Sequence, residues 1–192
     1  DAANYGALTE DNVRIITAHY LAMATFVDEQ VGRVLTTLRD TGLDGNTHVV
    51  FTSDHGDFCG DMGMFVKTDL PIRHLTHVPL LWVTPEGTDD RVESFSENVD
   101  LAPTFLQAAG IECPYYLEGK NLFDGGHRDW AIAESSDRES IDGSQRYQKT
   151  TSYTSYVDRE WNYIHSTKAD HCALYHLTQD PHCHRNVLHS FP

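Results

Sequence analysis

The sequence has no hydrophobic run long enough to cross a membrane and only a small share of positive charge. No apolar stretch approaches the roughly 20 residues that a bilayer-spanning helix needs, and the amino terminus has no basic segment followed by an apolar one. The formal net charge of -15 argues against nucleic acid and anionic membranes as partners, because both attract positively charged surfaces. These absences favour a soluble chain. A small anionic partner stays possible, since a bound metal ion and one lysine can reverse the local potential.

Cysteine pairs and glycosylation signals are also missing. The four cysteines form no C-x-x-C pair, and no N-x-S/T sequon occurs. Cys172 and Cys183 could close a disulfide loop, but two free thiols are the commoner state for a chain of this kind. The absence of a sequon and of a clear disulfide framework favours a cytoplasmic location.

The segment from His48 to Lys67 carries the strongest chemical signal. His48 to Thr52 is rich in β-branched and aromatic residues, which predicts a buried strand of a parallel sheet. Asp54 and His55 follow directly, at the carboxyl end of the strand, where open α/β sheets collect their ligands. The carboxylate and the imidazole could hold a metal ion. They could also form an ordinary turn, with Asp54 accepting backbone hydrogen bonds.

The longer pattern resembles the sulfatases of the alkaline phosphatase superfamily. In that family a motif S-D-H/N-G is followed by a glycine-rich loop and a lysine, and here the corresponding segment reads FTSDHGDFCGDMGMFVK. Further segments resemble the family's neighbouring elements, namely MATFVDEQVGRVLTTLRDTGLDGNTHVVFTSDHGD, VPLLWVTP, NVDLAPTFLQAAGI and ALYHLTQDPHCHRNVL. The match covers nearly the whole chain but only the carboxyl-terminal part of a sulfatase.

The resemblance implies site residues and a cofactor. Asp54 and His55 would bind one divalent metal ion, with Ca²⁺ or Mn²⁺ favoured and Mg²⁺ or Zn²⁺ possible. Lys67, 12 positions after His55, would contact the transferred group and assist the leaving oxygen. His74 and His77 are weaker candidates for substrate binding, and we expect both in a loop between the site and the next strand.

The pattern of hydrophobic residues predicts the remaining elements. Thr9 is expected to cap a long amphipathic helix that ends at Gly42, and Asp100 is expected to cap a helix that ends at Gly110. Val78 to Val83 reads as a second buried strand. Short aromatic or alternating runs predict an antiparallel sheet near the carboxyl terminus; they are 130–133, 147–157, 161–165 and 172–177. We expect residues 1–125 to form the last part of a sulfatase-type α/β domain and residues 126–192 a small antiparallel subdomain.

The carboxyl-terminal segment is rich in histidine, and the family's nucleophile is missing. Cys183 and His184, with Cys172 nearby, could suggest zinc, but their spacing matches no structural zinc pattern, so we expect surface histidines. No C/S-x-P-x-R nucleophile motif occurs; a formylglycine nucleophile, if used, would lie outside this chain.

The resemblance therefore implies a hydrolase of small sulfate or phosphate esters that works with the missing amino-terminal portion. Alone, the chain is expected to be inactive and could associate with itself. Two alternatives stay open: a phosphonate monoester or phosphodiester hydrolase of the same superfamily, and a noncatalytic binding or assembly domain derived from a sulfatase.

Overall fold

The computed structural model describes residues 8–87, 91–125, 128–140 and 147–190. The chain forms two compact units, of which unit 1 comprises Asp1–Lys67 and His77–Asp90, and unit 2 comprises Thr68–Thr76 and Arg91–Pro192. The division expected between residues 125 and 126 stays a prediction. Within the described residues no helix is long and apolar enough to cross a membrane. Besides the helices and strands given below, short 3-10 turns occur at η2 (Asp44–Asn46), η3 (Asp61–Gly63), η4 (Asn98–Asp100), η5 (Ala169–His171) and η6 (Leu188–Ser190).

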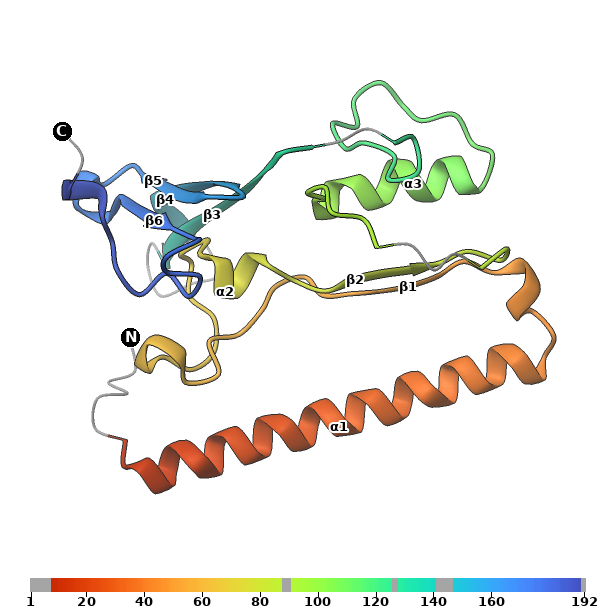
Figure 1. Ribbon diagram of the computed structural model, residues 1–192, viewed down its shortest axis with the longest axis horizontal. Coiled ribbons are helices and arrows are strands. Elements are labelled where there is room, and N and C mark those ends of the chain that lie inside the picture. Colours follow the sequence, from red (N-terminus) through yellow and green to blue (C-terminus); the bar gives the residue numbers. More distant parts are fainter. Residues whose placement is uncertain (1–7, 88–90, 126–127, 141–146, 191–192) are drawn as a thin grey trace. The chain divides into compact units, whose positions relative to one another are not determined.

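Helix α1 (Glu10–Asp40) is the longest element of unit 1 and begins where the sequence predicts (Figure 1). The backbone N–H of Asn12 donates to the Thr9 hydroxyl at 3.2 Å, and the backbone N–H of Thr9 donates to the Asn12 side chain at 3.2 Å. This reciprocal pair satisfies two N–H groups that a helix start leaves without intrahelical partners. The helix ends before Gly42, whose φ of 69° is a left-handed conformation that suits glycine. No side chain of α1 is buried.

Strand β1 (Val49–Thr52) pairs with β2 (Leu80–Val83) in antiparallel orientation, with Val49 opposite Val83. The prediction of a buried strand in a parallel sheet is therefore wrong for the pairing that the structure describes. The predicted burial of the two strands is wrong as well, since Phe51 of β1 and Leu81 of β2 are 43% and 58% exposed. An apolar run specifies neither the direction of its partner strand nor the layer that covers it, which is why the sequence misleads here.

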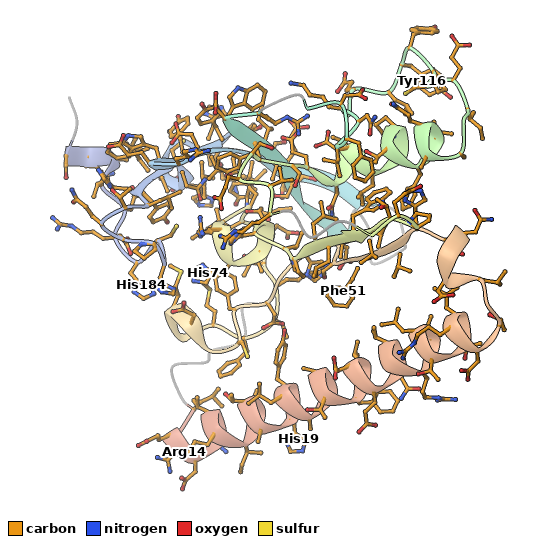
Figure 2. All side chains as sticks on the ribbon, turned by 45° about the vertical axis from the view of Figure 1, so that its right-hand side comes forward. Arg14, His19, Phe51, His74, Tyr116 and His184 are labelled. Carbon is orange, nitrogen blue, oxygen red and sulfur yellow. The ribbon has the colours of Figure 1, made fainter. Side chains whose placement is uncertain are left out.

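An apolar groove of about 1050 Å³ separates α1 from the β1–β2 pair inside unit 1. Figure 2 shows Phe51 directed from β1 towards α1. Most of the lining side chains are aliphatic; they include Val27, Val31, Leu35, Val49, Leu81 and Val83. The apolar side of the amphipathic helix thus faces the β1–β2 pair, but the groove keeps the two apolar faces from packing directly against each other.

Unit 2 contains two short helices. Helix α2 (Arg73–Thr76) occupies a segment that the sequence predicts as a loop, and the burial of Ile72 and Leu75 on one side of this turn explains why it is helical. Helix α3 (Leu101–Ala108) lies where the pattern predicts it, and Gly110 follows with a φ of 69°. Asp100 stands at the expected N-cap position, but its side chain makes no capping hydrogen bond to α3.

A four-stranded antiparallel sheet forms most of the rest of unit 2 and confirms the predicted carboxyl-terminal sheet (Figure 1). Its strands follow chain order: β3 (Trp130–Ser140), β4 (Tyr147–Asp158), β5 (Trp161–Ser166) and β6 (Ala173–His176). The turn between β4 and β5 is fixed by Asp158, whose carboxylate accepts the backbone N–H groups of Glu160 and Trp161 at 2.8 and 2.7 Å. One face of the sheet is covered and carries Tyr153, Ile164 and Tyr175 into the core.

Candidate active site

The turn after β1 places two potential metal ligands side by side. The backbone N–H of His55 donates to Asp54 Oδ1 at 2.9 Å, and the Ser53 hydroxyl donates to the His55 carbonyl at 2.8 Å. These bonds hold the chain in a tight turn of the kind that Asp side chains favour. Asp54 therefore does accept a backbone hydrogen bond within a turn, as the purely structural alternative requires. Its side chain is nevertheless 85% exposed, so it is also accessible to a cation. Its second oxygen, Oδ2, faces the His55 ring.

The hydrogen bond at one ring nitrogen of His55 decides what the other can do. Nδ1 lies 2.7 Å from the carbonyl oxygen of Gly56, and because a carbonyl can only accept, Nδ1 carries the proton. In the neutral ring this leaves the lone pair on Nε2. Nε2 lies 3.7 Å from Asp54 Oδ2. A carboxylate oxygen and an imidazole nitrogen therefore converge with the tautomer that metal ligation requires.

Lys67 belongs to the same electrostatic environment. The backbone N–H of His55, followed by the charges of His55 and Lys67, holds the pKa of Asp54 below its usual range. Lys67 makes the last of the contributions to this lowered pKa, so its charge acts on the Asp54 carboxyl group, while the catalytic and metal-binding roles of the three residues stay predictions. Asp54 is thus ionised over most of the pH range and available to a cation.

A constrained loop connects His55 to Lys67. The N–H of Gly60 donates to the Met64 carbonyl at 2.8 Å, and a Cβ atom at Gly60 would meet the Phe65 ring at 3.3 Å, so this position combines a close approach with a φ of 97°. Phe58 and Phe65 are buried and anchor the loop. Directly before Lys67, Val66 has a φ of 60°, which is a rare conformation for a β-branched residue.

The two weaker candidates for substrate binding, His74 and His77, belong to different units. His77 lies in unit 1, exposed, just before β2, whereas His74 lies in α2 of unit 2 and is half-buried. The expectation that His74 lies in a loop is wrong, because it is in α2. A role for His74 or His77 in substrate binding stays a prediction.

Sequence reasoning missed one neighbour of the site loop. Tyr20 of α1 counts as part of an apolar helix face in the sequence, yet partial burial, followed by the charges of Asp57 and Cys59, raises the pKa of its phenol. The phenol of Tyr20 is thus subject to the charges of Asp57 and Cys59, which belong to the loop after His55. No local sequence signal distinguishes this tyrosine from the aliphatic residues around it.

A second missed feature is a buried ion-pair network in unit 2. Arg128 donates to the two carboxylate oxygens of Asp100 at 2.7 and 3.0 Å and forms an ion pair with Glu97 at 2.6 Å. Asp100 also accepts the backbone N–H groups of Glu97 and Lys120, both at 2.8 Å. The aspartate that the sequence assigns to a helix cap therefore joins the segment before α3 to the segment before β3.

Comparisons with known proteins identify the family of the chain. The family model described as Sulfatase matches residues 3–111. Arylsulfatase K of Xenopus laevis is 31% identical over 201 residues, which cover 96% of this chain and 36% of that protein. N-acetylglucosamine-6-O-sulfatase of Bacteroides thetaiotaomicron is 39% identical over 105 residues, or 54% of this chain and 19% of that protein.

Among solved structures, the phosphonate monoester hydrolase of Agrobacterium radiobacter superposes with a TM-score of 0.82 and 27% identity, covering 96% of this chain and 39% of that chain. The fold is therefore part of the alkaline phosphatase-like α/β architecture, as the sequence predicts. The chain belongs to the sulfatase family. The chain spans about a third of the length of the relatives that match nearly all of it; for arylsulfatase K of Xenopus laevis the share is 36%.

Proposed function

We propose that the polypeptide carrying this chain is a metal-dependent hydrolase of sulfate esters, similar to the arylsulfatases. The observation that supports this most directly is the Asp54–His55 turn, in which an ionised carboxylate and the free Nε2 of an imidazole face each other at 3.7 Å under the influence of Lys67. Family membership supplies the reaction class, and the name of one relative adds a sulfated amino sugar as a possible substrate type.

Each residue has a distinct role in this proposal. Asp54 and His55 hold one divalent cation, and that cation, when bound, neutralises the negative charge that develops on the nonbridging oxygens of the ester. Lys67 donates from its ammonium group to the transferred group and stabilises the leaving oxygen. His74 and His77 are kept as weaker candidates for contacts with the substrate.

The donor set narrows the choice of metal. One carboxylate oxygen and one imidazole nitrogen, completed by further oxygen ligands, suit Ca²⁺ or Mn²⁺ best, and Mg²⁺ or Zn²⁺ stay possible. Two protein ligands are fewer than the three or more that usually hold a catalytic metal tightly. The proposal therefore includes further ligands, and the nucleophile, from the amino-terminal portion of the family's catalytic domain.

In this proposal, the missing amino-terminal portion covers the apolar groove of unit 1. It measures about 1050 Å³ and lies between α1 and the β1–β2 pair, where aliphatic side chains from both sides are left exposed. Burial of apolar surface drives such association at roughly 25 cal/mol per Å². The alternative is that two copies of this chain associate through the same surface. A measurement of the molecular mass in solution distinguishes the two cases.

Phosphonate monoester hydrolysis is the second candidate function. It is supported by the TM-score of 0.82 and the 27% identity to the Agrobacterium radiobacter enzyme. The two activities need the same kind of cation and lysine, so the described residues do not distinguish them. The relative values of kcat/KM for 4-nitrophenyl sulfate and for 4-nitrophenyl phenylphosphonate do.

The test uses a polypeptide that contains this chain together with the family's nucleophile segment. We expect turnover of 4-nitrophenyl sulfate that a chelator abolishes and that Lys67→Ala lowers by roughly 10²- to 10³-fold in kcat, as for the loss of one transition-state donor. Lys168→Ala, an exposed lysine of unit 2, is the matched control and should be neutral. Undiminished kcat in Lys67→Ala would refute the assigned role of Lys67, and full activity of this chain alone would refute the need for a second portion.

A further inference from the structure

Three histidine rings of unit 2 lie in a row, and the proposed function gives no role to two of them, His182 and His184. The rings of His74 and His182 have centroids 6.3 Å apart at an angle of 43°, and those of His182 and His184 are 5.7 Å apart at 34°. One ring nitrogen of His74 and one of His182 lie within 4.8 Å of each other. Figure 2 labels His74 and His184, the two ends of this row of rings.

The segment that carries two of these rings is held in place by the residue between them. Cys183 is completely buried and has a φ of 53°, so the chain reverses locally around it. Its N–H donates to the Asp180 carbonyl at 3.1 Å, and the Asp180 carboxylate accepts the N–H of Arg185 at 2.7 Å. Because Cys183 points into the protein, its two neighbours, His182 and His184, remain on the surface.

The third ring is fixed from the other side. His74 is half-buried in α2, whose neighbouring residues Ile72 and Leu75 are 0% and 6% exposed. The Cys183 thiol interacts with the backbone of Arg73, the residue before His74. The contact between α2 and the segment around Cys183 thus exists without any ion, and it holds His74 close to His182.

We propose that His74, His182 and His184 form a binding site for a transition-metal ion of the Zn²⁺ type, separate from the Asp54–His55 pair. Imidazole nitrogens suit Zn²⁺, Co²⁺, Ni²⁺ and Cu²⁺, whereas Ca²⁺ and Mg²⁺ require oxygen ligands. Zn–N distances of about 2.0–2.1 Å in a tetrahedral site bring ligand nitrogens to roughly 3.3 Å from each other. The ring nitrogens of His74 and His182, within 4.8 Å of each other, are already close to that spacing, and the His184 ring lies next to the His182 ring.

The thiol between the histidines is not a ligand in this site. Cys183 is completely buried, whereas His182 and His184 on either side of it are exposed, so its thiol does not face the surface that carries the imidazoles. Three imidazoles with a water molecule in the fourth position match the general pattern of three protein ligands and one open position. A bound ion would cross-link α2 to the chain segment that follows β6.

The experiment is a titration of the purified chain with Zn²⁺, followed by calorimetry, and with Co²⁺, followed by visible absorption. We expect one site with the absorption bands of tetrahedral Co²⁺, and a loss of affinity of at least tenfold in His182→Ala and in His184→Ala. His165→Ala and His189→Ala, which remove exposed histidines of the same unit, are matched controls and should leave the affinity unchanged. His182 and His184 are exposed, so their replacement should not disturb folding.

Two further variants make the assignment specific. His74→Gln should weaken Zn²⁺ binding while circular dichroism shows an unchanged melting temperature without the ion. The double variant Asp54→Asn, His55→Asn should retain the Zn²⁺ site in full, which separates this inference from the proposed catalytic metal. The proposal is overturned if His182→Ala and His184→Ala bind Zn²⁺ as the unaltered chain does, or if Zn²⁺ binding disappears only in the Asp54, His55 double variant.

Discussion

Unit 1 and unit 2 differ in how completely their apolar side chains are buried. Unit 1 carries the candidate catalytic group around Asp54, yet Phe26, Val34 and Leu81 in the same unit are 63%, 67% and 58% exposed. Unit 2 contains most of the fully buried side chains described, with Ile164 at 0%. The difference shows that helices and strands can form in a unit whose apolar side chains are not packed into a core. In unit 1 the helices and strands come from local signals such as a capping box and strand pairing, whereas a packed core needs a covering layer.

Polar interactions sharpen the same contrast. In unit 2 the guanidinium of Arg128 and the carboxylate of Asp100 are almost completely buried and satisfy each other in bidentate geometry. In unit 1 the ion pair between Arg14 and Glu10 is exposed to solvent along α1. Burial makes the first pair essential to its surroundings and leaves the second nearly neutral.

The largest expected effect is therefore on the buried pair. Asp100→Ala leaves a buried guanidinium with Glu97 as its remaining acidic partner among the described residues and removes the acceptor of two backbone N–H groups, so we expect a loss of about 3–5 kcal/mol in the free energy of unfolding. Arg14→Ala is the matched control at about 0.3–0.5 kcal/mol. Urea denaturation measures both. Equal effects would contradict the contrast between the two units.

Core packing gives the next effect. Ile164→Ala in the sheet of unit 2 should lower the free energy of unfolding by about 2–5 kcal/mol, because the side chain is fully buried. Val34→Ala in α1 should change it by no more than about 0.5 kcal/mol, since that side chain is 67% exposed. Thermal and urea denaturation of the two variants test this. A large effect of Val34→Ala would show that α1 is packed in solution.

The apolar groove of unit 1 should be detectable by a dye. Phe51 and Leu81 line it from the strand side, so the chain should enhance the fluorescence of an apolar dye such as ANS, and the double variant Phe51→Ser, Leu81→Ser should reduce that enhancement several-fold. Ile132→Ser, an exposed apolar residue of unit 2 outside the groove, serves as the control. Size-exclusion chromatography run in parallel shows whether a second copy already covers the surface.

The smallest effect concerns pH. The pKa of Asp54 is lowered in the folded chain, first by the N–H of His55 and then by nearby positive charge, so its ionised form stabilises the fold. This contribution is present above the unfolded pKa of about 3.9 and disappears as the pH falls through the folded pKa. We expect wild type and Asp54→Asn to differ slightly in urea midpoint at pH 6 and to converge near pH 2. A difference that grows towards acid pH would contradict this.

Local patterns carried most of the successful predictions. Thr9, Gly42 and Gly110 mark helix boundaries through capping chemistry that depends only on neighbouring residues, and the turn residues between the carboxyl-terminal runs predict an antiparallel sheet. The spacing of His55 and Lys67, together with the family resemblance, was sufficient to select residues that the structure places in one electrostatic environment.

The features that the sequence did not reveal depend on partners far along the chain. The antiparallel pairing of β1 was missed because 28 residues separate the paired Thr52 and Leu80. The side chain of Asp100 was expected to cap its own helix but bonds to Arg128, 28 residues away. The histidines near the carboxyl terminus looked like isolated surface residues because His74 lies more than 100 positions earlier.

The left-handed backbone conformation of Val66 indicates where the candidate site would first unfold locally. A β-branched residue at a φ of 60° stores on the order of 1–3 kcal/mol of local strain, and this strain lies directly beside Lys67. In a unit with few buried side chains, such a segment is the natural starting point for local opening. Hydrogen exchange would then be fastest around Lys67, and the lysine would lose its place while both units still kept their secondary structure.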